Sequence, residues 1–564
     1  MPQPAGAQTP GRTVVRGGHV LNVFTGELLP QDIMIEAGRI AALAPPQEAG
    51  EAATVIDAHD RVVVPGYVEP HAHLGLVAEP VSTLEQWAAH GTTAVVADTY
   101  PWLALLADEG FVAMLDRFQQ LPVYVRWMLV PHGRGFAPGE EETYRLERLD
   151  RFLAREDVVA LGEITRWSWV EQGEPDLAAK IARARALGKR IEGHSAGASP
   201  ARVMRLAQRG FTSCHEAIDA AQVMARLRAG LYVMLRHSSL RPDLPALLEA
   251  VRGDVVHSNR LMLTADGPTP PWVAEHGYLD HLIRIALESG VPPAAAYRMA
   301  TLNPAMYYRL EDDVGSVAPG RRADLLILES LANPTPLVVI AGGKVVAEGG
   351  RLATPFPRLD WAGLLAHGRL GARTGGRPPT AATFAQLPGP GEAGSPVLEL
   401  THTVIVRRAA AAERPLLAVL YDWEGRWLTH AWLTGLADEL AGLASSYNPS
   451  HQLLVLGSSP SDMALAAQRV MELGGGMAMA ERGRVLWELA LERGGIFTER
   501  PWPELVDGLR RMEALLRERG YRFGDPLYSL FFLSFDALPD FRLTIRGVWD
   551  VKAGRAVVPP RPLP

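Results

Sequence analysis

The stretch that decides the fold is "PGYVEPHAHLGL", residues 65–76. An apolar run ends at Pro65-Gly66. A second strand-like run follows and contains Glu69, His71 and His73 within five positions. Side chains alternate between the two faces of a strand, so His71 and His73 are expected to point the same way. A His-x-His pair alone is a weak signal, so a metal site requires further ligands elsewhere in the chain.

Length and composition indicate a cytoplasmic, multidomain protein of enzyme size. The 564 residues exceed what one hydrophobic core supports, so about two to four domains are expected. A net charge of -7 without a long basic run argues against a nucleic-acid partner. The single cysteine, Cys214, excludes an internal disulfide framework and fits a reducing compartment. No apolar run approaches the ~20 residues of a membrane span, and the first residues lack the apolar core of a signal peptide.

Alternating strand-like and helical patterns predict a (β/α)8 barrel over residues 65–305. Apolar runs such as 93–97, 158–161 and 260–264 are separated by longer helical patterns. This alternation is typical of repeated βα units around a parallel sheet. A length of roughly 240 residues suits a closed barrel of eight such units.

Short strands flank the predicted barrel on both sides. Residues 1–64 contain a turn sequence typical of β-hairpins at Glu36-Ala37-Gly38-Arg39. Residues 306–365 again contain short predicted strands, separated by Gly-Gly turns. We expect these two flanks to form one small composite β-domain. Residues 366–396, rich in Gly, Pro and Ala, are predicted to be a linker, and residues 397–564 a C-terminal α/β domain.

The ends of the predicted barrel strands carry residues of the types that bind metals. Catalytic groups of parallel barrels lie at the carboxyl ends of the strands. Five of these strand ends carry four histidines and two carboxylates, namely His71, His73, His194, His215, Glu163 and Asp266. A lone histidine is more often a surface or core residue, but five strand ends in sequential order rarely carry ligand types by accident.

These residue types indicate hydrolytic metal chemistry. Neutral imidazole and carboxylate are natural ligands of divalent first-row metals. Glu163 is a candidate bridge between two ions about 3.5–4 Å apart, which would lower the pKa of a bound water towards ~7. Asp266 is then the expected acceptor of the water's proton and its later donor to a leaving group.

Three further stretches extend this interpretation beyond the barrel. "NVFTGE" (residues 22–27) looks like an N-terminal β-domain motif, and residues 299–328 look like the return of the chain to that domain. Residues 458–485, "SSPSDMALAAQRVMELGGGMAMAERGRV", form the third stretch. Together with the strand-end ligands, these stretches resemble the adenine deaminases of the amidohydrolase superfamily over almost the whole chain, and the third is the most specific because most amidohydrolases lack such a domain.

The resemblance implies deamination of adenine to hypoxanthine and ammonia by a metal-bound hydroxide. It implies two divalent ions, Mn or Fe, with Zn common elsewhere in the superfamily. By position, His71 and His73 would bind the first ion, and Glu163 would bridge it to a second ion held by His194 and His215. Asp266 would bind metal and transfer protons. The expected partners are a purine base or related heterocycle and further copies of the chain, with no nucleic acid and no membrane.

Other residues are implied to contact the substrate. In "YVMLRHSS" (residues 232–239), Arg236 and Ser238 are candidate purine contacts. Glu216, next to the ligand His215, is a candidate donor of a proton to a ring nitrogen.

The positions on the substrate side depart from the family pattern. Typical members continue after His-x-His with Glu-Ser-Ser-Met, where this chain has Gly75-Leu76-Val77-Ala78, and they have Glu in place of His237. Their "HDSHN" segment appears here as residues 447–452, so whether His451 reaches the active site is open. Another aminated heterocycle or a cyclic amide is therefore an alternative substrate. A non-catalytic protein with the same fold is a second alternative, whereas zinc deaminases with a Pro-Cys-x-x-Cys motif are excluded by the single cysteine.

Overall fold

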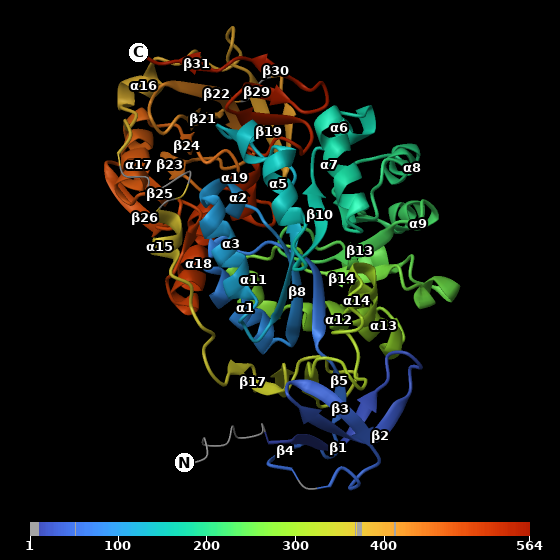
Figure 1. Cartoon of the computed structure of the whole chain (residues 1–564). Helices are drawn as coiled ribbons and strands as arrows, with labels where there is room; N and C mark the ends of the chain where they lie inside the picture. Colours follow the sequence, from blue (N-terminus) through green and yellow to red (C-terminus); the bar gives the residue numbers. More distant parts are fainter. Residues whose placement is uncertain (1–10, 51, 367, 369–374, 411–412) are drawn as a thin grey trace, which may run out of the picture.

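Eight parallel strands form the central sheet of the computed structural model, which describes residues 11–50, 52–366, 368, 375–410 and 413–564 (Figure 1). Their order is β14-β13-β12-β11-β10-β9-β8-β6, and a parallel bridge between Ala72 and Asp266 brings the two edges together. The predicted barrel is therefore confirmed. The strands are β6 (Tyr67–Ala72), β8 (Thr92–Asp98), β9 (Tyr124–Leu129), β10 (Val158–Ile164), β11 (Arg190–Gly193), β12 (Ser213–Cys214), β13 (Tyr232–Arg236) and β14 (Leu261–Thr264).

Helices follow the barrel strands and cover the outside of the sheet (Figure 1). Strands such as β8 are buried along their whole length, because helices lie on one face and the barrel interior on the other. The longer helices are α1 (Pro80–Ala89), α3 (Asp108–Phe118), α5 (Leu146–Leu153), α7 (Pro175–Ala186), α8 (Pro200–Gln208), α9 (Ala220–Arg228) and α12 (Leu279–Glu288). Shorter ones include α11 (Pro270–His276), α13 (Pro293–Met299) and α14 (Leu302–Tyr308).

Both flanks of the barrel contribute to one nine-stranded sheet, as predicted. Strand β5 (Val62–Pro65) lies at its centre, parallel to β1 (Thr13–Leu21) and antiparallel to β15 (Leu325–Leu328). The chain then passes into the barrel through Gly66, where an added Cβ would lie 2.0 Å from the Thr93 hydroxyl. The other strands are β2 (Leu28–Glu36), β3 (Arg39–Ala44), β4 (Thr54–Asp57), β16 (Val338–Ala341), β17 (Lys344–Glu348) and β18 (Arg351–Leu352).

The C-terminal region contains a second nine-stranded, mainly antiparallel sheet. Helices α17 (Pro460–Glu472), α18 (Trp502–Glu518) and α19 (Pro526–Phe532) accompany it. Its strands are β19 (Val397–His402), β20 (Ile405–Arg408), β21 (Leu416–Tyr421), β22 (Trp427–Thr434), β23 (Gly442–Ser445), β24 (Leu453–Gly457), β25 (Gly476–Glu481), β26 (Arg484–Ala490) and β31 (Arg561–Pro562). Strands β28 (Phe541–Thr544), β29 (Gly547–Asp550) and β30 (Arg555–Val558) form a separate sheet.

The predicted linker, residues 366–396, lies only partly within the described residues. Residues 367 and 369–374 are outside them. The described remainder contains the end of α15 (Trp361–Ala366) and the short helix α16 (Ala381–Ala385). The domain limits given above remain predictions.

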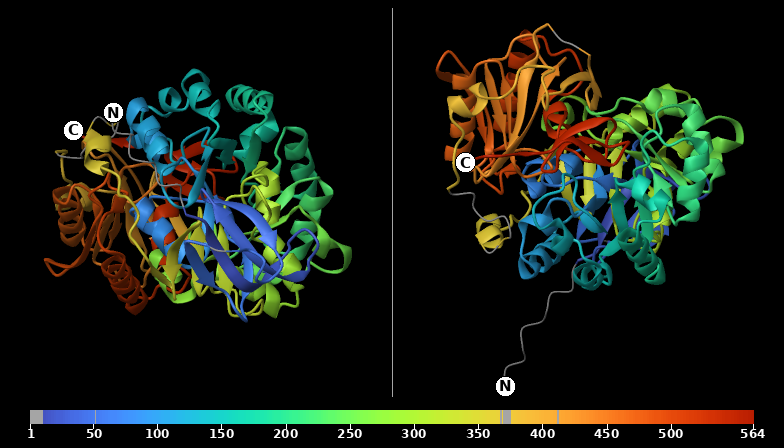
Figure 2. Two further views of the ribbon diagram at one scale, coloured as in Figure 1. Left: turned by 60° about the horizontal axis from the view of Figure 1, so that its bottom comes forward. Right: turned by 90° about the horizontal axis from the view of Figure 1, so that it is seen from above.

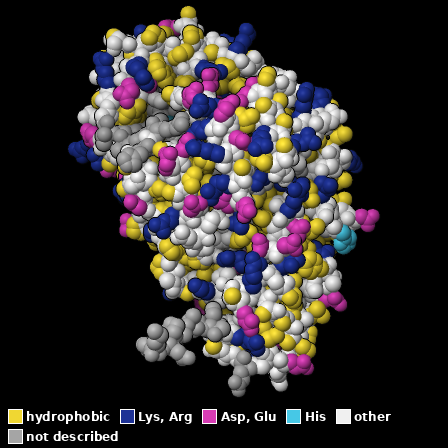
Figure 3. Space-filling view, in the orientation of Figure 1, with side chains coloured by type: hydrophobic (Ala, Val, Ile, Leu, Met, Phe, Trp, Pro, Cys, Tyr) yellow, Lys and Arg dark blue, Asp and Glu magenta, His cyan; other side chains and the backbone are white. Residues whose placement is uncertain are grey.

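The C-terminal region packs directly on the barrel (Figure 2). Strand β27 (Phe497–Thr498) pairs with β7 (Val77–Ala78), which follows the His-x-His motif. One apolar cluster runs without interruption from barrel residues such as Leu84 to C-terminal residues such as Leu530. Acidic and basic side chains are interspersed over the face shown in Figure 3. Within the described residues no helix has the length and apolar character needed to cross a bilayer.

Candidate metal centre

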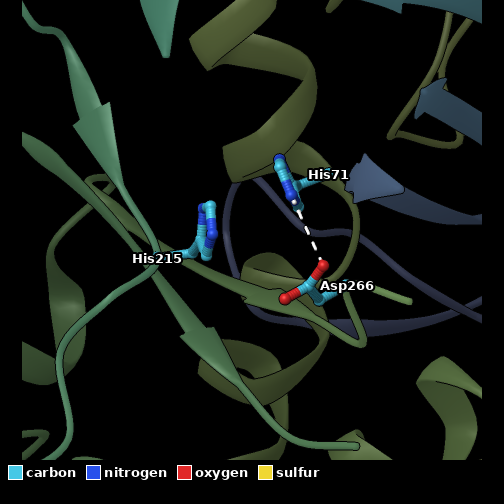
Figure 4. A group of neighbouring side chains, drawn as sticks. All are labelled: His71, His215 and Asp266. Carbon is cyan, nitrogen blue, oxygen red and sulfur yellow. Dashed lines mark ion pairs between the residues drawn. The ribbon is translucent and has the colours of Figure 1, made fainter. Parts of the chain in front are cut away.

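The six predicted ligands converge at the carboxyl ends of five barrel strands. His71 belongs to β6 and Glu163 to β10, whereas the other four follow the ends of β6, β11, β12 and β14. Figure 4 shows His71, His215 and Asp266 turned toward one another from three different strands. Asp266 has a left-handed backbone (φ 63°), which is uncommon for residues other than glycine and is found at functional sites.

The first group of ligand atoms has the spacing of a coordination shell. The Nε2 atoms of His71 and His73 are 3.3 Å apart. Asp266 Oδ1 lies 3.5 Å from the first nitrogen and 2.9 Å from the second. Two donors that each bind one ion at about 2.0–2.2 Å are themselves about 3–3.5 Å apart in tetrahedral geometry. These three side chains can therefore bind one cation.

Glu163 connects this group to a second one. Its Oε1 lies 3.2 Å from His215 Nε2 and 3.6 Å from His194 Nε2, and its Oε2 lies 4.0 Å from His73 Nε2. Glu163 belongs to two of the compact ligand triads among the described residues, one with His71 and His73 and one with His194 and His215. Its two oxygens therefore face the two groups of predicted ligands.

Acidic side chains lie behind three of the imidazoles, and one of them, Glu192, is hydrogen-bonded to His215. Glu192 Oε1 lies 2.9 Å from His215 Nδ1 and its Oε2 lies 3.7 Å from His71 Nδ1, while Asp98 Oδ2 lies 3.1 Å from His73 Nδ1. A carboxylate at Nδ1 favours the tautomer whose Nε2 lone pair is available to a metal. Within the described residues His215 Nε2 is buried and forms no hydrogen bond. This arrangement fits metal ligation better than a hydrogen-bonded core.

Buried charges balance one another around the ligands. Burial by itself would raise the pKa of Glu163, but Arg134, 2.9 Å away, and His194 outweigh it and hold that pKa well below its ordinary value. Burial likewise opposes ionisation of Glu216, but Arg236 at 2.6 Å prevails and lowers its pKa. Arg236 also donates a hydrogen bond to Asp266 at 2.8 Å. In contrast, burial raises the pKa of Glu192 well above its ordinary range, and Glu163 adds to the effect.

A cavity of about 40 Å³ lies over the ligands. The barrel lines it with Leu76, Arg134, Arg236, Leu240 and the predicted ligands His73, Glu163, His194 and Asp266, while the C-terminal region supplies Tyr528, Phe531, Phe532 and Phe535. Of the predicted substrate contacts, Arg236 lines this cavity, but Ser238 is buried outside its lining. His237 also lies outside it and contacts Trp272 and His281.

His451 lies beside a second cavity. This space of about 300 Å³ is also lined by Tyr100, Arg134, Glu140 and Tyr144. Arg134 is the one residue common to the linings of both cavities. In this arrangement His451 does not line the space over the ligands.

Several residues of the site were not predicted from the sequence. Asp98 is the last residue of β8, so the rule that collected the other ligands could have found it. Glu192 lies within β11, and Arg134 lies in the segment after β9, where no strand-end pattern marks them. The aromatic residues of α19 are more than 250 positions beyond the last barrel ligand, and no local pattern connects them to the site.

The barrel with its strand-end histidines and carboxylates is that of an amidohydrolase, and residues 62–346 match the amidohydrolase family. Residues 399–555 match the adenine deaminase C-terminal domain. The chain therefore belongs to the adenine deaminase family of the amidohydrolases, as its sequence resemblance indicated.

Relatives align over nearly the full chain. The adenine deaminase of Moorella thermoacetica is 32% identical over 97% of this chain and 95% of its own length. The adenine deaminase of Cenarchaeum symbiosum is 30% identical over 97% of this chain and 92% of its own. A protein of Halalkalibacterium halodurans, whose name gives adenine deaminase as a provisional assignment, is 32% identical over 97% of this chain and 94% of its own.

Proposed function

We propose that the chain catalyses metal-dependent hydrolytic deamination of adenine to hypoxanthine and ammonia. The observation that carries this proposal is the position of Glu163, which faces His73 with one oxygen and His194 and His215 with the other. A shared carboxylate is what a two-ion hydrolytic site requires. The names of the relatives indicate adenine as the substrate.

The donor set favours two divalent ions. His71, His73 and Asp266 would hold one ion, His194 and His215 the other, and Glu163 both. When bound, the ions supply a water activated for attack near neutral pH. Imidazole and carboxylate donors suit Mn, Fe and Zn alike, and the family resemblance favours Mn or Fe.

The chain's own residues would move the protons and orient the ring. Asp266 accepts the proton of the attacking water and donates it to the departing amine, so that ammonia leaves from C6. Arg236 lines the cavity and orients Asp266 through its hydrogen bond. Glu216 is held as a carboxylate by Arg236 and lies outside the lining of the cavity over the predicted ligands. Its role as a proton donor, and the contact between Ser238 and the substrate, stay predictions.

Another aminated heterocycle or a cyclic amide is the second candidate substrate. Leu76 occupies a position where typical family members have Ser, and it lines the cavity. The exchange at His237, by contrast, lies outside the cavity lining, so it does not alter the groups that face a substrate there.

The deciding experiment measures ammonia release by the Mn- or Fe-loaded chain. The substrates are adenine, other aminopurines, pterins and cyclic amides. We expect adenine turnover with kcat/KM above ~10⁴ M⁻¹ s⁻¹, the lower end for ordinary enzymes. His194→Ala should lose metal and activity, whereas His90→Ala, which removes an imidazole outside the centre, should keep both. Turnover of another heterocycle without adenine turnover would refute adenine as the substrate.

We also propose a cytoplasmic location and assembly into a homo-oligomer. The one cysteine, Cys214, is buried and forms no disulfide, which supports a reducing compartment. Analytical ultracentrifugation of the purified chain tests the assembly, and a monomer at micromolar concentration would contradict it.

A further inference from the structure

Helix α19 brings a group of aromatic rings to the metal centre from the C-terminal region. Tyr528, Phe531 and Phe532 belong to the helix, and Phe535 follows it. All four line the same cavity as His73, Glu163, His194 and Asp266. Figure 1 shows α19 between the C-terminal strands and the barrel. The barrel side of the cavity therefore carries the polar groups together with Leu76 and Leu240, and α19 supplies an aromatic side.

Phe532 is the central ring of this group. Its centroid lies 5.6 Å from Tyr528 in a stacked arrangement (23°), 5.2 Å from Phe531 and 5.1 Å from Phe535, the last two edge-on. Tyr528, Phe531 and Phe535 are buried, whereas Phe532 is half-buried. Among these four rings Phe532 can therefore change most readily without disturbing the core.

The aromatic group is anchored to the loop that carries the proposed proton-transfer residue. The Tyr528 hydroxyl donates a hydrogen bond to the carbonyl oxygen of Gly267, directly after Asp266. An added Cβ at Gly267 would lie 3.0 Å from that hydroxyl and 3.2 Å from the His73 ring. The close approach keeps the rings of α19 beside the ligands.

These surroundings select for a particular shape of ligand. Aromatic rings attract other aromatic rings in offset-stacked or edge-to-face geometry with centroids about 4.5–7 Å apart. A flat heterocycle can present its polar edge to the barrel side and its face to the rings, whereas a puckered saturated ring cannot stack in this way. The cavity, at about 40 Å³, is well below the ~300 Å³ of ordinary ligand pockets, so a ring must move to admit such a ligand.

We propose that Phe532 is the stacking surface for a flat aromatic heterocycle at the metal centre. The C-terminal domain thereby sets the preference for flat over saturated cyclic substrates. This inference rests on the proposed function in that the cavity over the ligands is taken to be where the substrate binds. Phe532, as the half-buried ring, is also the side chain that moves to admit the heterocycle.

The experiment compares four full-length, metal-loaded proteins: the unchanged chain, Phe532→Leu, Phe532→Tyr and Phe523→Leu. Phe523 is the matched control, because it is a half-buried ring of the same region that lies outside the cavity lining. Binding of hypoxanthine and of the saturated cyclic amide dihydrouracil is measured by calorimetry, together with metal content. Where a substrate is turned over, its KM and kcat are also measured.

Stacking of a base on an aromatic side chain is strong enough to predict a loss of about 10-fold or more in hypoxanthine affinity for Phe532→Leu. Phe532→Tyr keeps the ring and should stay within about 3-fold, and Phe523→Leu should match the unchanged chain. For a turned-over flat substrate, KM should rise more than kcat falls, as for lost uniform binding. Metal content should be equal in all four proteins.

The proposal is overturned if Phe532→Leu binds hypoxanthine as tightly as the unchanged chain, or if the Leu and Tyr variants lose affinity equally. It is also overturned if the unchanged chain binds dihydrouracil better than hypoxanthine, or binds neither. Failure of the proposed function gives a different result. In that case adenine is not deaminated, while binding of hypoxanthine still depends on the ring at position 532, which supports the proposal.

Discussion

Replacing Glu192 with leucine should weaken metal binding at the centre, chiefly through His215. Glu192 is fully buried, and its Oε1 lies 2.9 Å from His215 Nδ1, within hydrogen-bond distance, whereas its Oε2 lies 3.7 Å from His71 Nδ1, too far for a hydrogen bond. Leucine removes the hydrogen-bond acceptor of His215 Nδ1. A hydrogen bond between uncharged groups contributes about 0.5–1.5 kcal/mol, which is roughly 2- to 13-fold in affinity. Outer partners of metal-binding histidines typically change affinity by about 10–100-fold.

The assay is competition between the protein and a chromophoric chelator for Mn²⁺ or Zn²⁺. Glu192→Leu should raise the metal dissociation constant by about 10–100-fold. Glu192→Gln keeps an acceptor oxygen and resembles the neutral carboxyl that burial favours, so its effect should be less than about 10-fold. Asp280→Asn is the matched control, because it removes a buried carboxylate beside His90, outside the centre. A folded Glu192→Leu protein that binds metal as tightly as the unchanged chain would refute this reasoning.

Three further outcomes are expected. Asp266→Asn should lower kcat by ~10² or more with metal still bound, and near-normal turnover would show that the proton moves elsewhere. Burial and the neighbouring His281 and His276 lower the pKa of His237 from 6.5 to about 4, so its contribution to stability is present above pH 6.5 and is lost as the pH falls toward 4. His237→Gln should therefore reduce the fall in Tm over that range, and an unchanged Tm profile would contradict this. A chain ending at residue 395 should be insoluble or inactive, because the apolar core continues into the C-terminal region; soluble, fully active protein would contradict that role.

The sequence by itself determined the barrel and predicted which strand-end residues lie together. Parallel strands that alternate with helices place their carboxyl ends at one rim. A ligand-type residue at each such end, from His71 to Asp266, therefore predicts that these side chains lie close together, and the distances between them agree. Short strands on both sides of the barrel also predicted the composite sheet, and resemblance led to the family. These features follow from local patterns repeated along the chain.

Only the tertiary structure decided what surrounds those ligands. Glu192 and Arg134 interact with them through contacts across strands and loops that no local spacing encodes. The same holds for α19, whose rings reach the cavity because the C-terminal region packs on the barrel. His237, one residue after Arg236 in sequence, turns away from the cavity toward Trp272 and His281. Neighbours in sequence can face opposite sides of a strand end, whereas packing brings distant residues together, and packing depends on the whole chain.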